Sequence, residues 1–387
     1  MIFDVTKDIK YVGVDDCDID LFESQYVVPN GISYNSYVVL DEKIAIMDTV
    51  DKRKCGEWLE NVATVLGSRQ PDFLVVHHLE PDHAGSIADV MAKYPALQIV
   101  TSARAAQMMP QFYVEDSFAE RTIAVKEGDT LSLGKHTLHF AMAPMVHWPE
   151  VMVSYDAADK VLFSADGFGK FGALSHDEEW ACEARRYYFN ICGKYGQPVQ
   201  ALLKKAATLD IECICPLHGP VLKENLGYYI GLYDTWSKYD VETEGVFVAF
   251  ASIHGNTAEV ARKMKDILIA KGAAKVSIAD LSRDDMAEAV EDAFRMGKLV
   301  VAAASYDGDV FPPMHDFLHH LKIKSYQKRR VGIIENGSWA PVAGRVMRSM
   351  LETMKDVEIV EPMVTIRSRM KQEDIPSLEA LADAILA

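Results

Sequence analysis

The sequence has no long apolar stretch and little positive charge. None of its apolar runs approaches the about 18 residues that a membrane-spanning helix needs, so we expect no membrane partner. Lys and Arg number 40 against 57 Asp and Glu, for a formal net charge of −17. This balance excludes a general nucleic-acid-binding protein, which needs a basic surface. Residues 1–5 lack the basic segment and apolar core of a signal peptide, which favours a cytoplasmic protein.

Cysteine is scarce as well. Six cysteines are scattered over 387 residues, a usage typical of cytosolic proteins without a disulfide framework. Cys213 and Cys215 are the only close pair, but they lack the C-x-x-C spacing and alternate along an apolar segment. We interpret them as core residues of a strand. The overall composition, 49% hydrophobic and 25% charged, is that of a soluble globular protein long enough for two domains.

One short stretch concentrates side chains that bind metal ions. Residues 78–83 contain His78, Glu80, Asp82 and His83. An apolar run that predicts a buried strand precedes them, and a helical pattern follows from residue 84. Because a proline at position 81 argues against one continuous helix, we expect a strand-to-helix turn whose side chains point at one spot. Taken alone, the stretch could also be a polar loop.

Three further candidates repeat this pattern. His147, Asp166 and His218 each follow an apolar strand pattern and precede Gly or Pro. A layered sheet fold gathers such strand ends at one edge. Seven ligands are too many for one tetrahedral ion, but they suit two ions about 3.5–4 Å apart that share a carboxylate. The predicted metal ligands are His78, Glu80, Asp82, His83, His147, Asp166 and His218.

The second part of the chain alternates strand and helix patterns. Apolar strand patterns occur at residues 246–251, 276–279, 299–304, 331–334 and 357–360. Helical patterns separate them, which predicts a doubly wound domain with a five-stranded parallel sheet. A charged segment near residue 243 is the predicted junction. We therefore assign residues 1–243 to a first domain and residues 244–387 to a second.

Three loops that follow these strands have the composition of a flavin site. The first is small and polar and precedes an amphipathic helix, whose N-terminal N–H groups can bind an anion. It is neither a Walker A loop nor a G-x-G-x-x-G loop. The other two offer backbone groups beside an aromatic ring, as a flat isoalloxazine requires. The predicted cofactor-binding residues are Ser252, Ile253, His254, Gly255, Asn256, Thr257, Ser305, Tyr306, Asp307, Gly308, Asn336, Gly337, Ser338, Trp339 and Ala340.

Both parts resemble known folds. The first resembles the metallo-β-lactamase fold, an αββα sandwich whose hydrolases usually show H-x-H-x-D-H. Glu80 replaces the second His of that motif, and a carboxylate there favours iron over zinc. The second part resembles flavodoxin, which implies FMN. The whole chain resembles the flavodiiron proteins, or A-type flavoproteins. Further segments that carry this resemblance are residues 18–23, 33–37, 147–149, 183–188 and 218–220.

This resemblance implies a function. Members of the family reduce dioxygen to water, nitric oxide to nitrous oxide, or both, at two iron ions that receive electrons from FMN. By position, His78, Glu80 and His147 bind the iron nearer the flavin. Asp82, His83 and His218 bind the second iron, and Asp166 bridges the two. Tyr26, Trp148 and Tyr195 are candidates to line the pocket, with core packing as the alternative.

The resemblance also implies partners. In this family a head-to-tail homodimer brings the FMN of one subunit beside the irons of the other, and we expect such a dimer or a tetramer built from it. No C-x-x-C pair follows the flavodoxin-like part, so we expect no fused rubredoxin. Electrons are then expected from a separate donor, rubredoxin or a similar carrier, served by an NADH-dependent reductase.

Departures from the family pattern leave other functions open. Residues 337–344 differ from the usual G-S-Y-G-W-S-G type of loop, and His254 stands where Tyr or Thr is common. One alternative is a zinc hydrolase with an appended flavodoxin-like domain. Another is an FMN electron-transfer module with a structural metal. The ligand set does not rank dioxygen against nitric oxide, because both need the same side chains.

Overall fold

The computed structural model describes residues 1–114 and 116–387. The chain forms two compact units. Met1–Tyr188 and Gln197–Asp234 make up the first, and Phe189–Gly196 and Thr235–Ala387 make up the second. None of the helices in the described part of the chain is long and apolar enough to cross a membrane.

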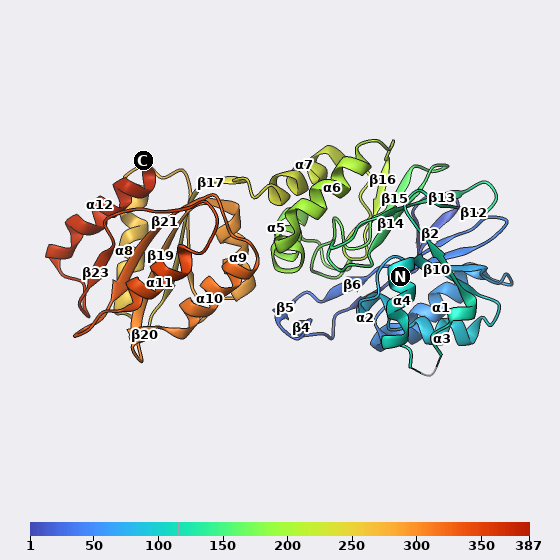
Figure 1. The fold of residues 1–387 in the computed structure, drawn as a ribbon, viewed down its shortest axis with the longest axis horizontal. Coiled ribbons are helices and arrows are strands. Elements are labelled where there is room, and N and C mark those ends of the chain that lie inside the picture. Colours follow the sequence, from blue (N-terminus) through green and yellow to red (C-terminus); the bar gives the residue numbers. More distant parts are fainter. Residues whose placement is uncertain (115) are drawn as a thin grey trace. The chain divides into compact units, whose positions relative to one another are not determined.

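Two sheets form the core of the first unit (Figure 1). The larger one has the order β1-β2-β7-β8-β9-β10-β11. Its strands are β1 Phe3–Asp4, β2 Ile9–Tyr11, β7 Tyr37–Val39, β8 Ala45–Met47, β9 Phe73–Val76, β10 Gln98–Ser102 and β11 Thr122–Val125. The smaller one consists of β12 Thr130–Ser132, β13 Thr137–Met142, β14 Met152–Asp156, β15 Val161–Phe163 and β16 Cys213–Cys215. Apolar side chains of both sheets, Val75 and Phe163 among them, form one buried cluster between them.

Helices cover the outer faces of the two sheets, which gives the αββα sandwich expected from the sequence (Figure 1). Helix α1, Cys55–Leu66, buries Cys55, Trp58, Val62 and Leu66 at three- and four-residue intervals. Such spacing places them on one helix face. The other helices are α2 Pro81–Ala84, α3 Ile87–Lys93, α4 Ala103–Met108, α5 Trp180–Tyr187, α6 Gly196–Ala206 and α7 Leu226–Ser237. Short pairs, β3 Val14–Asp16 with β6 Ile32–Tyr34 and β4 Leu21–Phe22 with β5 Tyr26–Val27, complete this unit.

The parallel strands explain why distant residues meet at one edge. Strands β15 and β16 are parallel, and Phe163 pairs with Cys215 in their last register position. Asp166 and His218 each stand three residues beyond that pair. The predicted turn after β9 contains a short helix, because α2 begins at Pro81 rather than after it. Proline is compatible with the first position of a helix, where its missing N–H needs no partner.

The second unit is the doubly wound parallel sheet that the sequence predicts. Its strand order is β18-β17-β19-β21-β22, with β20 beside β19 and β23 beside β21. The strands are β17 Thr243–Ala251, β18 Val276–Asp280, β19 Met296–Tyr306, β20 Asp309–Val310, β21 Arg329–Asn336, β22 Val357–Ile359 and β23 Val364–Ile366. Because β22 and β23 pair with successive parts of β21, they share the place of the predicted fifth strand.

Helices lie on both faces of this sheet (Figure 1). Helices α8 Asn256–Ala270 and α12 Ile375–Leu386 pack with the sheet into one apolar cluster. Helices α9 Met286–Arg295, α10 Pro312–Ile323 and α11 Ala343–Leu351 contact the strands from the other face. The loops that follow β17, β19 and β21 therefore meet at the carboxyl edge of the sheet, where ligands of such folds bind.

Candidate metal centre

Two groups of side chains, all buried except the half-buried Glu80, gather beyond the ends of β9, β15 and β16. Within each group, one nitrogen or oxygen atom of every residue lies within 4.8 Å of the others. The first group comprises His78, Glu80, His147 and Asp166, and the second comprises Asp82, His83 and His218. All seven side chains predicted from the sequence are thus brought together. That they bind metal ions stays a prediction.

Asp166 faces both groups. Its Oδ2 atom lies 3.3 Å from Nε2 of His78 and 3.4 Å from Nε2 of His147. Its Oδ1 atom lies 3.3 Å from Nε2 of His83 and 3.9 Å from Nε2 of His218. A carboxylate that turns one oxygen toward each of two sets of ligands has the geometry of a bridge between two ions.

The remaining atoms of each group point at a common centre. In the first, Oε2 of Glu80 lies 2.9 Å from Nε2 of His147 and 3.2 Å from Nε2 of His78. In the second, Nε2 of His83 and Nε2 of His218 lie 3.0 Å apart. Both of these nitrogens lie 3.2 Å from Oδ2 of Asp82. Each group thus offers two imidazole nitrogens and one carboxylate.

The hydrogen bonding of these side chains fits cations. Neither carboxylate oxygen of Asp82 or of Asp166 has a hydrogen-bond partner among the described residues, although all four atoms are buried. A buried charge without a partner is costly. The imidazole of His218 donates from Nδ1 to the carbonyl oxygen of Ser33 over 2.7 Å, which leaves a lone pair on the inward Nε2. Nitrogen and oxygen donors of this kind suit iron and other first-row metals.

Burial and charge shift the pKa values within the cluster. Burial raises the pKa of Asp82 to about 7, although the neighbouring His83 lowers it. For Asp166 the effect of burial is outweighed by the neighbouring imidazoles, above all His78, and its pKa lies well below the usual value. Burial lowers the pKa of His147, but the neighbouring carboxylates raise it to about 9. The charged form of Asp166 is therefore stabilised by the imidazoles beside it, whereas burial disfavours the charged form of Asp82.

Glu150 is a residue that sequence reasoning missed. Its Oε1 atom accepts hydrogen bonds from Nδ1 of His78, over 2.8 Å, and from the backbone N–H of Leu79, over 3.0 Å. In the sequence, its position three residues after His147 could have indicated that it lies near the cluster. His77, in contrast, is a buried core histidine, because Nδ1 contacts Asp48 and Nε2 contacts Ser154.

The three predicted pocket aromatics have different surroundings. The ring of Trp148 lies 5.2 Å from the ring of His78, so it borders the first group. The ring of Tyr26 lies 5.8 Å from the ring of Phe171, measured between centroids. Tyr195 ends a short 3-10 turn in the second unit, not in the unit that holds the cluster. Sequence reasoning also missed Phe22, whose ring lies 5.5 Å from that of His218.

The second unit has a cavity of about 580 Å³ at the carboxyl edge of its sheet. All of the predicted cofactor-binding residues except Gly255 line it, together with Ala304, Val342 and Ser368. The side chains of Trp339 and Tyr306 at this cavity are 89% and 45% exposed. The volume lies within the range of about 300–1,000 Å³ that is usual for small-molecule sites.

Backbone groups shape the part of this cavity next to α8. Gly255 precedes the helix with φ of +88°, a left-handed conformation that glycine adopts without strain. Oγ of Ser252 accepts hydrogen bonds from the N–H groups of Gly255 and Ala258, over 3.1 and 3.2 Å. The first N–H groups of a helix have no partner within it, so those of Asn256 and Thr257 can bind a phosphate.

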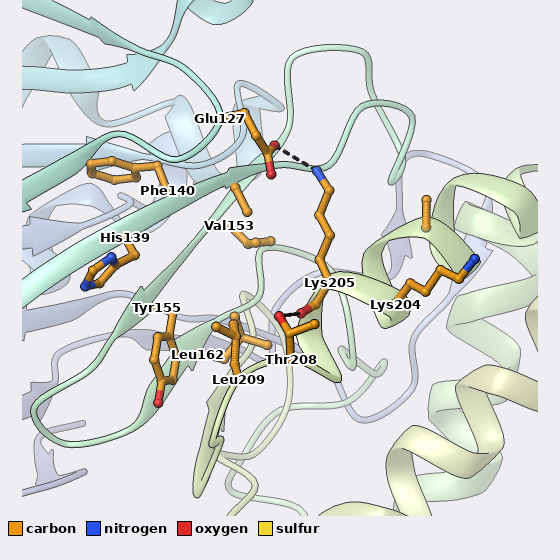
Figure 2. Close-up of a pocket in the computed structure, with 12 residues that line it drawn as sticks. Glu127, His139, Phe140, Val153, Tyr155, Leu162, Lys204, Lys205, Thr208 and Leu209 are labelled. Carbon is orange, nitrogen blue, oxygen red and sulfur yellow. Dashed lines mark hydrogen bonds and ion pairs between the residues drawn. The ribbon is translucent and has the colours of Figure 1, made fainter.

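A second cavity of about 580 Å³ lies in the first unit, between the smaller sheet and the end of α6 (Figure 2). Val153, Tyr155 and Leu162 line its apolar floor. Nζ of Lys205 and Oε2 of Glu127 form an ion pair at its rim, 2.7 Å apart. None of the seven clustered side chains lines it, so this cavity is separate from the candidate metal centre.

Comparisons with known proteins agree with this architecture. The family model described as ODP family beta lactamase matches residues 32–219. A nitric oxide reductase of Moorella thermoacetica is 28% identical, over 99% of this chain and 98% of the relative. An anaerobic nitric oxide reductase flavorubredoxin of Escherichia coli is also 28% identical, over 87% of this chain and 72% of the relative.

Solved structures cover the whole chain. The rubredoxin oxygen:oxidoreductase of Desulfovibrio gigas has a TM-score of 0.93 and 25% identity, covering 100% of this chain and 98% of that one. The flavodiiron protein of Giardia intestinalis matches in fold, with a TM-score of 0.91, 23% identity and coverage of 99% and 96%. The fold of the two units agrees with these comparisons, which extend along the full length of the chain. The chain is similar to flavodiiron proteins along its full length.

Proposed function

We propose that this protein reduces dioxygen to water, nitric oxide to nitrous oxide, or both, at a non-haem diiron centre that receives electrons through FMN. The observation that carries the proposal is Asp166, whose two buried oxygens each face a pair of imidazole nitrogens. The names of the relatives support it, since they include nitric oxide reductases and an oxygen oxidoreductase.

The seven side chains divide between the two ions. His78, Glu80 and His147 would hold one iron, Asp82, His83 and His218 would hold the other, and Asp166 would be shared between them. When bound, the irons supply open coordination positions for the gas, and FMN supplies the electrons. None of the seven is a cysteine, so the centre contains no thiolate that an oxidant could attack.

Residues around the first group limit the access of water. The ring of Trp148 lies against His78, and the ring of Phe112 stacks on Trp148 at a centroid distance of 6.3 Å. The Glu80 side chain is 15% exposed, whereas those of His78 and Asp166 are fully buried. We infer that the gas approaches the centre past Glu80.

Exposed apolar side chains support a head-to-tail homodimer, or a tetramer built from it. Trp339 and Tyr306 are exposed at the candidate flavin cavity. Near the metal centre, Leu21 and Val27 are 38% and 44% exposed on the hairpin that carries Phe22. Exposed apolar groups of this kind favour a protein contact. We propose that the flavin cavity of one subunit meets the metal centre of its partner.

The electron donor is a separate protein in this proposal. Rubredoxin, or a carrier of similar kind, served by an NADH-dependent reductase, reduces the FMN. Two of the relatives carry this chemistry in their names, as a flavorubredoxin and a rubredoxin oxygen:oxidoreductase.

Gas electrodes and metal analysis test the proposal. Protein purified without oxygen should contain two irons and one FMN per chain, and after reduction it should consume at least one of the two gases. Asp166→Ala should keep FMN and lose turnover, because the bridge is removed. Glu127→Ala is the matched control, since Glu127 is an acid of the separate cavity, and it should behave as the parent protein. Two zinc ions with thioester or lactam hydrolysis, and no gas consumption, would contradict the proposal.

A further inference from the structure

We propose that Glu150 is a positioning residue for His78, and that it makes the His78-Glu80-His147 position bind a divalent metal ion more tightly than the Asp82-His83-His218 position. This inference rests on the proposed two-metal centre and adds to it an order of affinity between its two positions.

Glu150 is fixed in place from both ends. Its side chain is buried, and Oε1 receives the N–H groups of His78 and Leu79. Its own backbone carbonyl oxygen accepts a hydrogen bond from Oγ of Ser102, over 2.7 Å. The backbone of Glu150 is thus held by Ser102 of β10, and its carboxylate is held through Oε1 by the segment that follows β9.

This contact determines which nitrogen His78 presents. Since Oε1 of Glu150 accepts from Nδ1, the lone pair of the neutral imidazole is on Nε2, which points at Glu80 and Asp166. A carboxylate acceptor also increases the electron density on the ligating nitrogen. The ring of Trp148 packs against His78 and shields the pair from solvent, so the interaction is not weakened by water.

The other position has no such support. Nδ1 of His218 donates to the neutral carbonyl oxygen of Ser33, and the buried Nδ1 of His83 has no hydrogen-bond partner among the described residues. The direct ligands of the two positions match, with two imidazoles and one carboxylate each beside the shared Asp166. The buried negative charge of Glu150 is therefore the difference that favours the first position.

Titration of the metal-free protein with Co²⁺ alone tests this inference. The colour of bound Co²⁺ and competition with a chelator report each binding step separately from enzymatic turnover. The parent protein should bind two ions, the first more tightly. Glu150→Ala removes both the acceptor and the charge, and should weaken the tighter step by about 10- to 100-fold. The weaker step should keep its affinity.

Glu150→Gln separates charge from orientation. Its amide oxygen can still accept from His78 and Leu79, so the ring keeps its orientation while the charge is lost. We expect a smaller loss than for Glu150→Ala, again confined to the tighter step. This near-isosteric variant also decides the matter if Glu150→Ala does not fold. Glu127→Gln, the matched control outside the centre, should leave both steps unchanged.

Two results would overturn the inference. One is unchanged affinity for both ions in Glu150→Gln and in Glu150→Ala. The other is a loss confined to the weaker step. Failure of the proposed function gives a different result, since a parent protein that binds fewer than two Co²⁺ ions contradicts the two-metal centre itself.

Discussion

At the scale of single residues, the candidate centre depends on which nitrogen each histidine turns inward. His78 and His218 both donate from Nδ1, the first to a carboxylate and the second to a backbone carbonyl. Their Nε2 atoms face the carboxylates of Glu80 and Asp82. Hydrogen bonds to groups other than the seven clustered side chains thus determine which ring nitrogen of each of these two histidines faces the centre.

The sequence predicted the seven clustered residues because each follows a strand end or lies in one short motif. It could not assign Glu150, because reaching Nδ1 of His78 depends on the path of the loop that also carries His147. It could not place Tyr195 either, since nothing local relates that residue to the unit containing the cluster.

A buried histidine outside the centre should make stability depend on pH. Burial lowers the pKa of His136, but Asp156 at 2.9 Å and Asp8 at 3.4 Å raise it above its usual value. Since the folded-state pKa is the higher one, the stabilisation is complete below the unfolded value of about 6.5 and is lost as pH rises through the folded value. Lys135, which pairs with Asp8 and Asp159, stays charged over this window.

The measurement is the free energy of unfolding against pH for the parent protein and for His136→Gln. The advantage of the parent should be largest below about pH 6.5 and shrink as pH rises. An advantage that stays constant, or that grows with rising pH, would show that His136 does not carry this charge.

At the scale of elements, parallel strands bring residues from distant parts of the chain together. The register of β15 with β16 places Asp166 and His218 at one edge. Apolar strand patterns predicted the parallel strands of the second unit from the sequence. The continuation of the outermost strand as β23, and hence Ser368 at the flavin cavity, was not predicted. The sequence pattern does not show that two short strands share one neighbour.

The turn before α8 leads to a second prediction. Gly255 has φ of +88°, and an added Cβ would meet nothing within 4 Å, so only backbone strain opposes a side chain there. Gly255→Ala should lower the free energy of unfolding by about 1–2 kcal/mol. It should also weaken FMN binding, because the phosphate-binding turn is distorted.

Gly56→Ala is the matched control. Gly56 lies within α1, has open space around its Cβ position and has no positive φ. This substitution should be neutral or stabilise by up to about 1 kcal/mol. Denaturant unfolding and FMN fluorescence titration of both variants are the measurements. Equal effects of the two substitutions would contradict the strained turn.

At the scale of the whole molecule, the proposal divides the reaction between two subunits. A variant without the metal bridge, Asp166→Ala, should retain a usable FMN. A variant such as Asn256→Glu should retain the metal centre but repel the phosphate of FMN, because it adds negative charge at the start of α8. In a head-to-tail dimer, the FMN of the first variant serves the metal centre of the second.

Mixing the two inactive variants under conditions that exchange subunits should therefore restore gas consumption. Each variant mixed with itself is the control and should stay inactive. A mixture that forms mixed dimers without regaining activity would contradict electron transfer between subunits.

Anomalous diffraction at the iron edge, from crystals of the iron-loaded protein, would locate the metal ions themselves. We expect two iron peaks on either side of the Asp166 carboxylate, about 3.5–4 Å apart. One peak belongs to the His78 group and the other to the His83 group. A single peak, or iron bound away from these side chains, would contradict the proposed diiron centre.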